Sequence, residues 1–405
     1  MSATLLVADR LLTCEARGGD ALGSFEPGAV LFDETGIHAV GSPQDVVPLG
    51  GAATRVEHRG LVTPGLVDAH THAAWMGSRA REYGMRMAGA DYETIAAAGG
   101  GIVASMRAIR AASRRDIAET LAARLARMAS LGVTTVEVKS GYGLSEADER
   151  KQLEAIAIAS ENAALPRVVP TFLGLHALPP EARTGASDDR VRYAGQVLSW
   201  LDGIAQEGLA AFVDAYVDRA AFSVTEVRPV LLRARELGLG VRLHIGQFAD
   251  VGGAALAAEV GAASVDHLEH LSAEGAALLA ATRTAAVLLP TASFTLGQAP
   301  PDVPILRAAG VSIVVASDAN PGTAPTESLP LAMALAARAY GLDLTEIILG
   351  VTARAASSLG TSGGRLAVGA PSDLVLWSFE HEAELLQPWG LARARAVYRG
   401  GRSIA

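Results

Sequence analysis

Residues Thr134-Thr-Val-Glu-Val-Lys139 form a short run rich in β-branched side chains, followed by the loop Ser140-Gly-Tyr-Gly-Leu144 and the alanine-rich stretch Glu146–Ala159. β-Branched residues bounded by glycine are typical of a strand, and apolar residues three and four positions apart are typical of an amphipathic helix. One unit of strand, loop and helix is therefore predicted here. Its recurrence along the chain decides the fold class.

Eight apolar runs of this kind alternate with helical stretches, of which Asp116–Leu131 is another, across the middle of the chain. Alternating strands and helices predict a parallel sheet, and eight such units in roughly 250 to 300 residues match a (β/α)8 barrel. We therefore predict an α/β fold with a TIM barrel over residues 61–360. The eight runs are Gly65–His70, Thr134–Lys139, Arg167–Leu173, Phe212–Val217, Val241–Ile245, Ala263–His267, Ala285–Pro290 and Val311–Ala316.

The two ends of the chain have a different pattern. Short apolar runs separated by glycine, proline and aspartate are typical of short antiparallel strands. Because these runs occur at both ends, we predict that residues 1–60 and 361–405 together form one small β-sandwich domain. The runs include Thr4–Ala8, Ala29–Phe32, Gly364–Val368, Leu374–Trp377 and Ala396–Arg399.

The composition argues against several classes of protein. A net charge of −9 without a cluster of lysine and arginine argues against a nucleic-acid partner and favours a small-molecule substrate. The single cysteine, Cys14, excludes an internal disulfide framework and a multi-cysteine zinc module. Met1–Arg10 lacks the pattern of a secretory signal, and Thr284–Pro301 is too polar for a membrane span. A cytoplasmic protein without a membrane partner is expected.

Residues with metal-binding chemistry follow several of the runs, at the edge where a barrel carries its active site. His70 and His72 end the first run, and residues two apart in an extended strand point to the same side. His244 ends the fifth run, and Asp318 follows the eighth. Three imidazoles and one carboxylate suit zinc or iron, with an open position for the water that is the expected nucleophile.

One metal ion per chain is expected. Barrel hydrolases with two metals commonly need a bridging ligand at the end of a middle strand, often a modified lysine. The fourth run, Phe212–Val217, contains no lysine, and the whole chain has only Lys139 and Lys151. We expect Lys139 to form an ion pair, with Glu137 or a neighbouring carboxylate, rather than to bridge two metals.

The arrangement of an H-x-H pair, two later strand-end histidines, an aspartate on the eighth strand and a sandwich from both termini resembles the amidohydrolase superfamily. More narrowly, the sequence is similar to the imidazolonepropionase family, the ring-opening hydrolases of histidine degradation. The similar segments span nearly the whole barrel. They are His70-Thr-His72, Gly77-Ser-Arg-Ala-Arg-Glu82, Ala98-Gly-Gly-Gly-Ile102, Gly132–Leu144, Thr171–Pro179, Val265-Asp-His-Leu-Glu269 and Ser317-Asp-Ala-Asn-Pro-Gly-Thr323.

The resemblance implies a reaction and a set of site residues. The reaction is hydrolysis of the cyclic amide bond of 4-imidazolone-5-propanoate, a small planar ring with a carboxylate tail, to N-formimidoyl-L-glutamate. The implied metal ligands are again His70, His72, His244 and Asp318. The implied substrate contacts are Arg79, Tyr142, His176, Gln247, Asn320, Gly322 and Thr323.

For several of these residues the side-chain chemistry itself suggests a contact with the substrate, and each also has a purely structural explanation. The guanidinium of Arg79 suits a carboxylate, although a solvated surface arginine has the same signature. Tyr142, in a glycine-flanked loop, can cover a ring or simply pack. The turn from Asn320 to Thr323 can present amide and backbone N–H donors to an anion, or can be a plain turn.

The strand-five segment His244-Ile-Gly-Gln247 departs from the family pattern, because an acidic or polar residue is expected at Gly246 and some relatives carry glutamate in place of Gln247. A glutamine cannot accept the proton of the nucleophilic water. Acid–base catalysis is therefore expected from His267 or from Asp318, with Gln247 limited to hydrogen bonding.

Two other functions use the same features. A deaminase of a related heterocycle would need the same metal ligands, and a catalytically silent barrel could act as a binding protein. The intact ligand set at four separate strand ends argues against the silent barrel. A homodimer is a further expectation, since such barrels are commonly dimeric.

Overall fold

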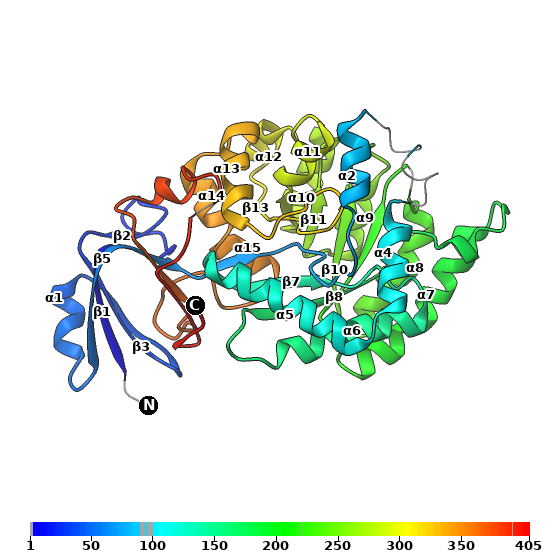
Figure 1. The fold of residues 1–405 in the computed structure, drawn as a ribbon. Coiled ribbons are helices and arrows are strands. Elements are labelled where there is room, and N and C mark those ends of the chain that lie inside the picture. Colours follow the sequence, from blue (N-terminus) through cyan, green and yellow to red (C-terminus); the bar gives the residue numbers. More distant parts are fainter. Residues whose placement is uncertain (1–2, 90–93, 95–99, 220, 391) are drawn as a thin grey trace.

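The computed structural model describes residues 3–89, 94, 100–219, 221–390 and 392–405. Two sheets organise the chain: a barrel from its middle and a second sheet from its two ends, which lie side by side in Figure 1. Residues 98 and 99 of the glycine-rich segment Ala98–Ile102 lie outside the described residues.

The barrel consists of eight parallel strands in sequence order, as predicted. It closes between its first and last strands, where Thr71 pairs with Ala319 and the amide of Asp318 donates to the carbonyl of His70 at 3.1 Å. The strands are β6 (Leu66–Asp68), β7 (Val133–Lys139), β8 (Arg167–Leu175), β9 (Phe212–Val217), β10 (Gly240–Ile245), β11 (Ser264–His267), β12 (Ala285–Leu288) and β13 (Ile313–Val315).

The first and last barrel strands are shorter than the apolar runs suggested. β6 ends at Asp68, so His70 and His72 lie just beyond the strand and not within it. Their backbone is still extended and paired, because the amide of His72 donates to the carbonyl of Ala319 at 3.0 Å. The two imidazoles therefore stay on one side, as the i, i+2 argument requires.

Helices surround the barrel, whereas the short helix Pro43–Val46 packs on the second sheet (Figure 1). Several begin at a side-chain cap; Ser113 and Asp116 form a capping box at the start of α5, and Ser145 caps α6. The helices are α1 (Pro43–Val46), α2 (Ala80–Met87), α4 (Ile102–Ala111), α5 (Arg114–Ser130), α6 (Glu146–Ser160), α7 (Asp189–Gln206), α8 (Val224–Glu236), α9 (Gly253–Val260), α10 (Ala273–Thr282), α11 (Pro290–Leu296), α12 (Val303–Ala309), α13 (Leu329–Tyr340), α14 (Leu344–Gly350) and α15 (Ala353–Ser358).

The second sheet joins both ends of the chain, and it forms the β-sandwich part of the fold. Its β5 pairs with β1 on one side and with β14 on the other. Its strands are β1 (Thr4–Leu12), β2 (Ser24–Phe25), β3 (Gly28–Asp33), β4 (Gly36–Gly41), β5 (Thr54–Pro64), β14 (Leu374–Trp377), β15 (Ala396–Arg399) and β16 (Arg402–Ser403). The limits 1–60, 61–360 and 361–405 stay a prediction; β5 runs across the first of them.

One strand prediction is wrong. Gly364–Val368 forms no strand, although Leu366 is buried in the core of the terminal sheet. Gly364 has a φ of +73°, and a turn closes from Ala367 to Ala370, so the backbone leaves the extended conformation on both sides of Leu366.

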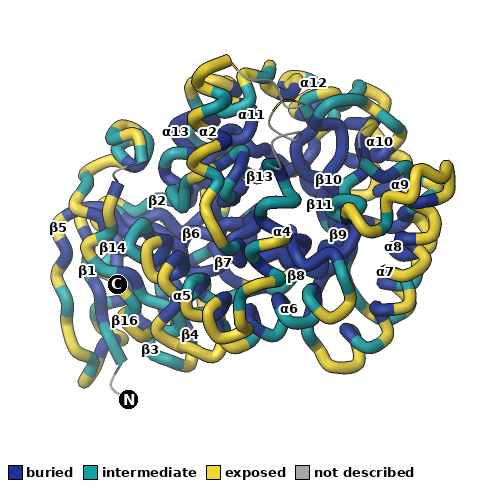
Figure 2. The backbone as a smooth tube through the Cα atoms, turned by 45° about the vertical axis from the view of Figure 1, so that its right-hand side comes forward, coloured by how far each residue is buried: buried dark blue, intermediate teal, exposed yellow. Residues whose placement is uncertain are grey.

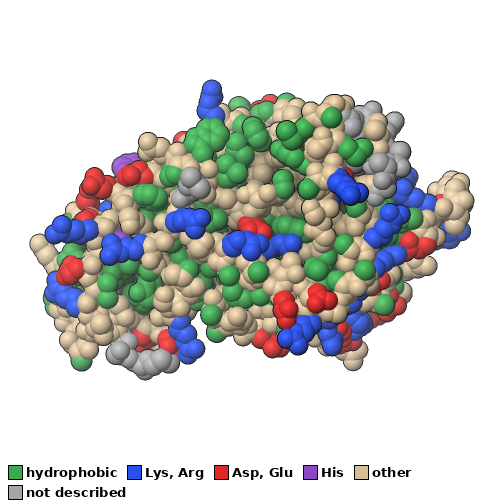
Figure 3. Space-filling model, in the orientation of Figure 1, with side chains coloured by type: hydrophobic (Ala, Val, Ile, Leu, Met, Phe, Trp, Pro, Cys, Tyr) green, Lys and Arg blue, Asp and Glu red, His purple; other side chains and the backbone are tan. Residues whose placement is uncertain are grey.

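Burial is concentrated on the barrel strands, while the outer turns of the helices are exposed (Figure 2). On the face in Figure 3, basic side chains are interspersed with acidic ones. Within the described ranges, the helices include none long and apolar enough to cross a membrane.

Candidate active site and metal centre

Four candidate ligand atoms converge at the carboxyl ends of the barrel strands. Asp318 Oδ1 lies 3.5 Å from His70 Nε2 and 3.6 Å from His72 Nε2. His244 Nε2 lies 3.4 Å from His72 Nε2. All four side chains are buried. The structure therefore brings together the four residues that the sequence analysis selected as metal ligands.

The electrostatics of this cluster fit a divalent metal. Burial lowers the pKa of His70 and of His72 well below the ordinary value, so both rings are neutral, the form that binds a metal. His70 Nε2 is buried without a hydrogen-bond partner in the described part of the chain. Such a nitrogen is costly unless it binds something, and imidazole with carboxylate is a common donor set for transition metals.

Two buried carboxylates contact the Nδ1 atoms of the imidazoles, on the side opposite to Nε2. Asp266 Oδ2 lies 2.7 Å from His70 Nδ1, and Asp214 Oδ1 lies 3.1 Å from His244 Nδ1. A carboxylate on Nδ1 fixes the ring and leaves Nε2 for the metal. Neither aspartate was predicted from the sequence, although an acidic residue inside an otherwise apolar strand was a usable signal.

His267 and Glu269 form a second buried pair beside the cluster. His267 Nδ1 lies 3.9 Å from Glu269 Oε2. Burial lowers the pKa of His267, but the Glu269 carboxylate, followed by Asp318, more than offsets this and raises it above the ordinary value. Burial also raises the pKa of Asp318 to about 7. Both residues have positive φ angles, 82° and 55°, a strained conformation that is common at functional sites.

The rings of His176 and Tyr142 lie next to His72. His176 is stacked on His72 with centroids 5.0 Å apart, and Tyr142 lies 6.0 Å from His72 and 5.4 Å from His176. Tyr142 is buried, and burial raises the pKa of its hydroxyl although the charge of Arg79 opposes the shift. These two predicted substrate contacts therefore lie next to the cluster of candidate metal ligands.

Glu149 holds the loop that carries Tyr142. Its carboxylate accepts hydrogen bonds from the amides of Gly141 at 2.9 Å, Gly143 at 2.8 Å and Leu144 at 2.8 Å. A Cβ on Gly143 would lie 2.4 Å from the Glu149 amide nitrogen, so the close approach requires glycine. Glu149 was also missed by the sequence analysis, because nothing in its helical context marks it as buried.

Gln247 is anchored from two sides. The Tyr216 hydroxyl donates to Gln247 Oε1 at 2.7 Å, and Gln298 Nε2 donates to the Gln247 carbonyl at 3.0 Å. The Tyr216 ring also lies 5.8 Å from the ring of His244. Tyr216 follows Asp214 by two residues on β9, and this alternation was the signal that could have found it.

The N–H donors of the turn from Asn320 to Thr323 form hydrogen bonds within the turn and to the neighbouring Asp318 carbonyl. Asn320 Oδ1 accepts hydrogen bonds from the amides of Gly322 and Thr323, both at 2.8 Å, and Asn320 Nδ2 donates to the Asp318 carbonyl at 2.7 Å. The structure thus differs from the expectation that this turn offers free N–H groups. An amide side chain two residues before a backbone donor readily closes such a turn.

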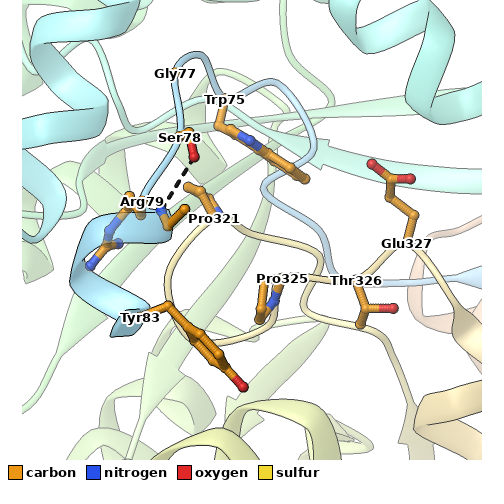
Figure 4. Close-up of a pocket in the computed structure, with 10 residues that line it drawn as sticks. Trp75, Gly77, Ser78, Arg79, Tyr83, Pro321, Pro325, Thr326 and Glu327 are labelled. Carbon is orange, nitrogen blue, oxygen red and sulfur yellow. Dashed lines mark hydrogen bonds between the residues drawn. The ribbon is translucent and has the colours of Figure 1, made fainter. Parts of the chain in front are cut away.

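Arg79 is not a solvated surface residue. Its side chain is 13% exposed and pairs with Glu82 at 2.6 Å. A Cβ on Gly322 would lie 2.2 Å from a guanidinium nitrogen of Arg79, so the arginine packs directly on the turn. Arg79 also borders a cavity of about 430 Å³, shown in Figure 4, with Trp75 and Tyr83 among its lining residues.

Comparison with known proteins agrees with this geometry. Residues 61–400 match the Amidohydrolase family. The imidazolonepropionase of Verminephrobacter eiseniae (strain EF01-2) is 46% identical over 347 residues, covering 85% of this chain and 75% of the relative. That of Caulobacter vibrioides (strain NA1000 / CB15N) is 44% identical over 391 residues, covering 95% and 96%. The chain therefore belongs to the amidohydrolase family and, within it, to the imidazolonepropionases.

Solved structures share the fold at low sequence identity. A triazine hydrolase variant has a TM-score of 0.77 at 17% identity, covering 99% of this chain and 94% of the other. The aminofutalosine deaminase of Helicobacter pylori has a TM-score of 0.72 at 14% identity, covering 99% and 100%. These neighbours support the architecture of a barrel with a sheet from both termini.

Proposed function

We propose that this protein hydrolyses the ring amide bond of 4-imidazolone-5-propanoate to give N-formimidoyl-L-glutamate, a step of histidine degradation. The observation that carries the proposal is the convergence of three imidazoles and Asp318 beside His267, in a chain 46% identical to a protein named imidazolonepropionase. A small planar substrate with a carboxylate fits a site bordered by flat rings and an arginine.

One zinc or iron ion held by His70, His72, His244 and Asp318 is part of the proposal. The neutral, unpartnered Nε2 of His70 supports it, as does the nitrogen and oxygen donor set. Such an ion, when bound, polarises a carbonyl and lowers the pKa of a water molecule.

Substrate binding is assigned to the residues around the cluster. Arg79 would hold the carboxylate of the substrate, and the rings of Tyr142 and His176 would cover its imidazolone ring. Gln247 would donate a hydrogen bond from Nε2, because its Oε1 already accepts one from Tyr216. Asn320, Gly322 and Thr323 would shape the wall on which Arg79 rests.

Proton transfer is assigned to His267, with Asp318 as the other candidate. Opening the ring breaks a carbon–nitrogen bond, adds the oxygen of water to the carbon and places a proton on the leaving nitrogen. Glu269 lies beside Nδ1 of His267, so Nε2 is the nitrogen left to hold or move that proton. A neighbouring carboxylate also favours the charged imidazolium that forms during the transfer.

The test is direct. Purified metal-loaded protein is incubated with imidazolonepropionate freshly generated by urocanase, and the loss of its ultraviolet absorbance is followed. Enzymatic loss of absorbance with formation of N-formimidoyl-L-glutamate is expected. Release of ammonia without that product would favour a deaminase, and an unchanged substrate would contradict the proposal. A homodimer and a cytoplasmic location stay predictions.

A further inference from the structure

Lys139, at the end of β7, is buried among three carboxylates. Its Nζ lies 2.8 Å from Glu137 Oε1, 2.8 Å from Asp214 Oδ2 and 3.8 Å from Asp266 Oδ2. All four side chains have 0% exposure. An ion pair with Glu137 or a neighbouring carboxylate was expected from the sequence, and the structure pairs Lys139 with Glu137 and with two aspartates.

Each of these carboxylates also contacts a candidate metal ligand or a residue next to one. Asp214 contacts His244 Nδ1 at 3.1 Å, and Asp266 contacts His70 Nδ1 at 2.7 Å. Glu137 Oε2 accepts a hydrogen bond at 3.1 Å from the amide of Thr71, the residue between His70 and His72. One ammonium group is therefore two contacts away from the rings of His244 and His70 and from the backbone amide of Thr71, which lies between His70 and His72.

Electrostatics requires a cation at this place. Carboxylate oxygens of Asp214 and Asp266 lie within 4.8 Å of one another, in a region without exposed surface. A second buried cation, Arg242, has its Nη2 3.8 Å from Asp266 Oδ1, whereas Lys139 contacts both aspartates and is their shared counter-ion. Buried like charges repel strongly, so without that shared counter-ion the two carboxylates would be less firmly held against their imidazoles. The ammonium approaches from the Nδ1 side, whereas the candidate ligand atoms are on the Nε2 side, so Lys139 is placed to orient ligands and not to be one.

We propose that Lys139 is a positioning residue for the metal centre: its ammonium group holds Asp214 and Asp266 against Nδ1 of His244 and His70 and so aims both Nε2 atoms at one ion. The inference rests on the metal site of the proposed function. Outer contacts of metal-bound histidines set ring orientation, and their loss typically weakens metal binding about 10- to 100-fold.

The chain offers a matched pair of variants, because Lys139 and Lys151 are its two lysines. Lys151 also has an aspartate partner, Asp148 at 2.9 Å, but lies at the partly exposed surface of α6. In Lys139→Met, the dissociation constant for Zn²⁺, measured by competition with a chromogenic chelator, is expected to rise at least about 10-fold. The absorption spectrum of the Co²⁺-loaded protein should change as well. Lys151→Met should match the parent in both measurements.

A double-mutant cycle separates positioning from a general structural effect. If Lys139 acts through Asp214, the combined Lys139→Met and Asp214→Asn variant should lose less affinity than the product of the two single losses. Multiplicative losses, or parent-like affinity in folded Lys139→Met, would overturn the inference. Circular dichroism and thermal unfolding of metal-free protein test whether each variant is folded.

Three further outcomes are decisive. If Lys139→Met does not fold, Lys139→Gln replaces it, with the same expected loss of Zn²⁺ affinity; failure of both to fold would make the lysine a folding element and overturn the inference. A parent that binds no Zn²⁺ contradicts the metal site itself. A parent that binds Zn²⁺ but opens no ring contradicts the proposed function while leaving the Lys139 comparison valid.

Discussion

The hydroxyl of Tyr216 donates a hydrogen bond to Oε1 of Gln247 at 2.7 Å, which fixes the orientation of the amide and with it the position of its Nε2 donor. Gln247 is thus a hydrogen-bond donor held in one orientation. An amide such as that of Gln247 can bind the substrate by hydrogen bonding, but it cannot accept or supply the proton that hydrolysis moves.

His267 and Gln247 are therefore expected to respond differently to substitution. His267→Asn should lower kcat about 100-fold or more with metal content unchanged, because it removes the proton carrier. Gln247→Ala should mainly raise KM, since it removes one hydrogen bond. Gln247→Glu should be tolerated or faster, because it supplies a carboxylate. Steady-state kinetics with metal analysis of each variant checks this; an active His267→Asn beside an inactive Gln247→Ala would reverse the assignment.

Arg79 is expected to bind an anionic oxygen of the substrate. Arg79→Met should reduce kcat/KM about 10- to 100-fold, the scale of a lost hydrogen bond to a charged group. Arg81→Met is the matched control, since Arg81 is exposed and lies in the first turn of α2, the helix that Arg79 precedes as its N-cap residue. Equal kinetics of the two variants would mean that Arg79 does not bind the substrate and has a structural role, through its ion pair with Glu82 and its packing on Gly322.

Metal content is expected to be about one transition metal ion per chain, because the Lys139 ammonium is already paired with carboxylates and does not bridge two ions. Elemental analysis of the purified protein checks this number. His244→Ala should lose the metal, whereas His38→Ala, a change at an exposed histidine of the terminal sheet, should retain it. Two tightly held ions per chain would contradict the expectation.

Glu149 is expected to matter for substrate binding through the Tyr142 loop. In Glu149→Gln, the new NH2 group faces a backbone amide that also donates, so at least one of the three loop hydrogen bonds is lost. KM should rise several-fold, and the free energy of unfolding should fall by about 1–3 kcal/mol. The exposed Glu146→Gln, on the same helix, is the control in both the kinetic and the urea-unfolding measurements.

Three histidines should each contribute to a loss of stability of the metal-free protein in acid, whereas the raised pKa values of Asp318 and His267 act in the opposite direction. His70 and His72 have pKa values well below the ordinary one because they are buried, and burial lowers the pKa of the half-buried His176 to about 3. Below about pH 6.5 the unfolded chain takes up protons at these three histidines while the folded protein does not, so their contribution to the free energy of unfolding falls as pH decreases.

His176 gives a single-site test of that pH dependence. In His176→Gln, the slope between about pH 6 and pH 4 should decrease by up to about 1.4 kcal/mol per pH unit, the value for one proton. The comparison is made by urea unfolding of the metal-free parent and variant at several pH values. Parallel pH profiles would mean that His176 takes up its proton equally in both states.

Much of this molecule could be predicted from local sequence. The period-two and period-3.6 patterns indicated eight strand–helix units, because burying one face of each element imposes those periods. The candidate metal ligands could be selected in the same way, since in a barrel the carboxyl ends of all strands meet on one face, and His70, His72, His244 and Asp318 come at such ends. Both arguments need only neighbours in the sequence and a known symmetry of the fold.

Tertiary structure decided what those residues contact. Three pairings join residues from different strands or the segments that directly follow them, at distances that depend on the register and shear of the closed barrel. They are Lys139 with Asp214, Asp266 with His70, and Tyr216 with Gln247. The Asn320 turn is a local exception, because its side chain accepts the amide of Gly322 two residues on, a contact that asparagine in a turn readily makes. The sequence thus determined which groups reach the site, whereas packing determined their orientation and charge partners.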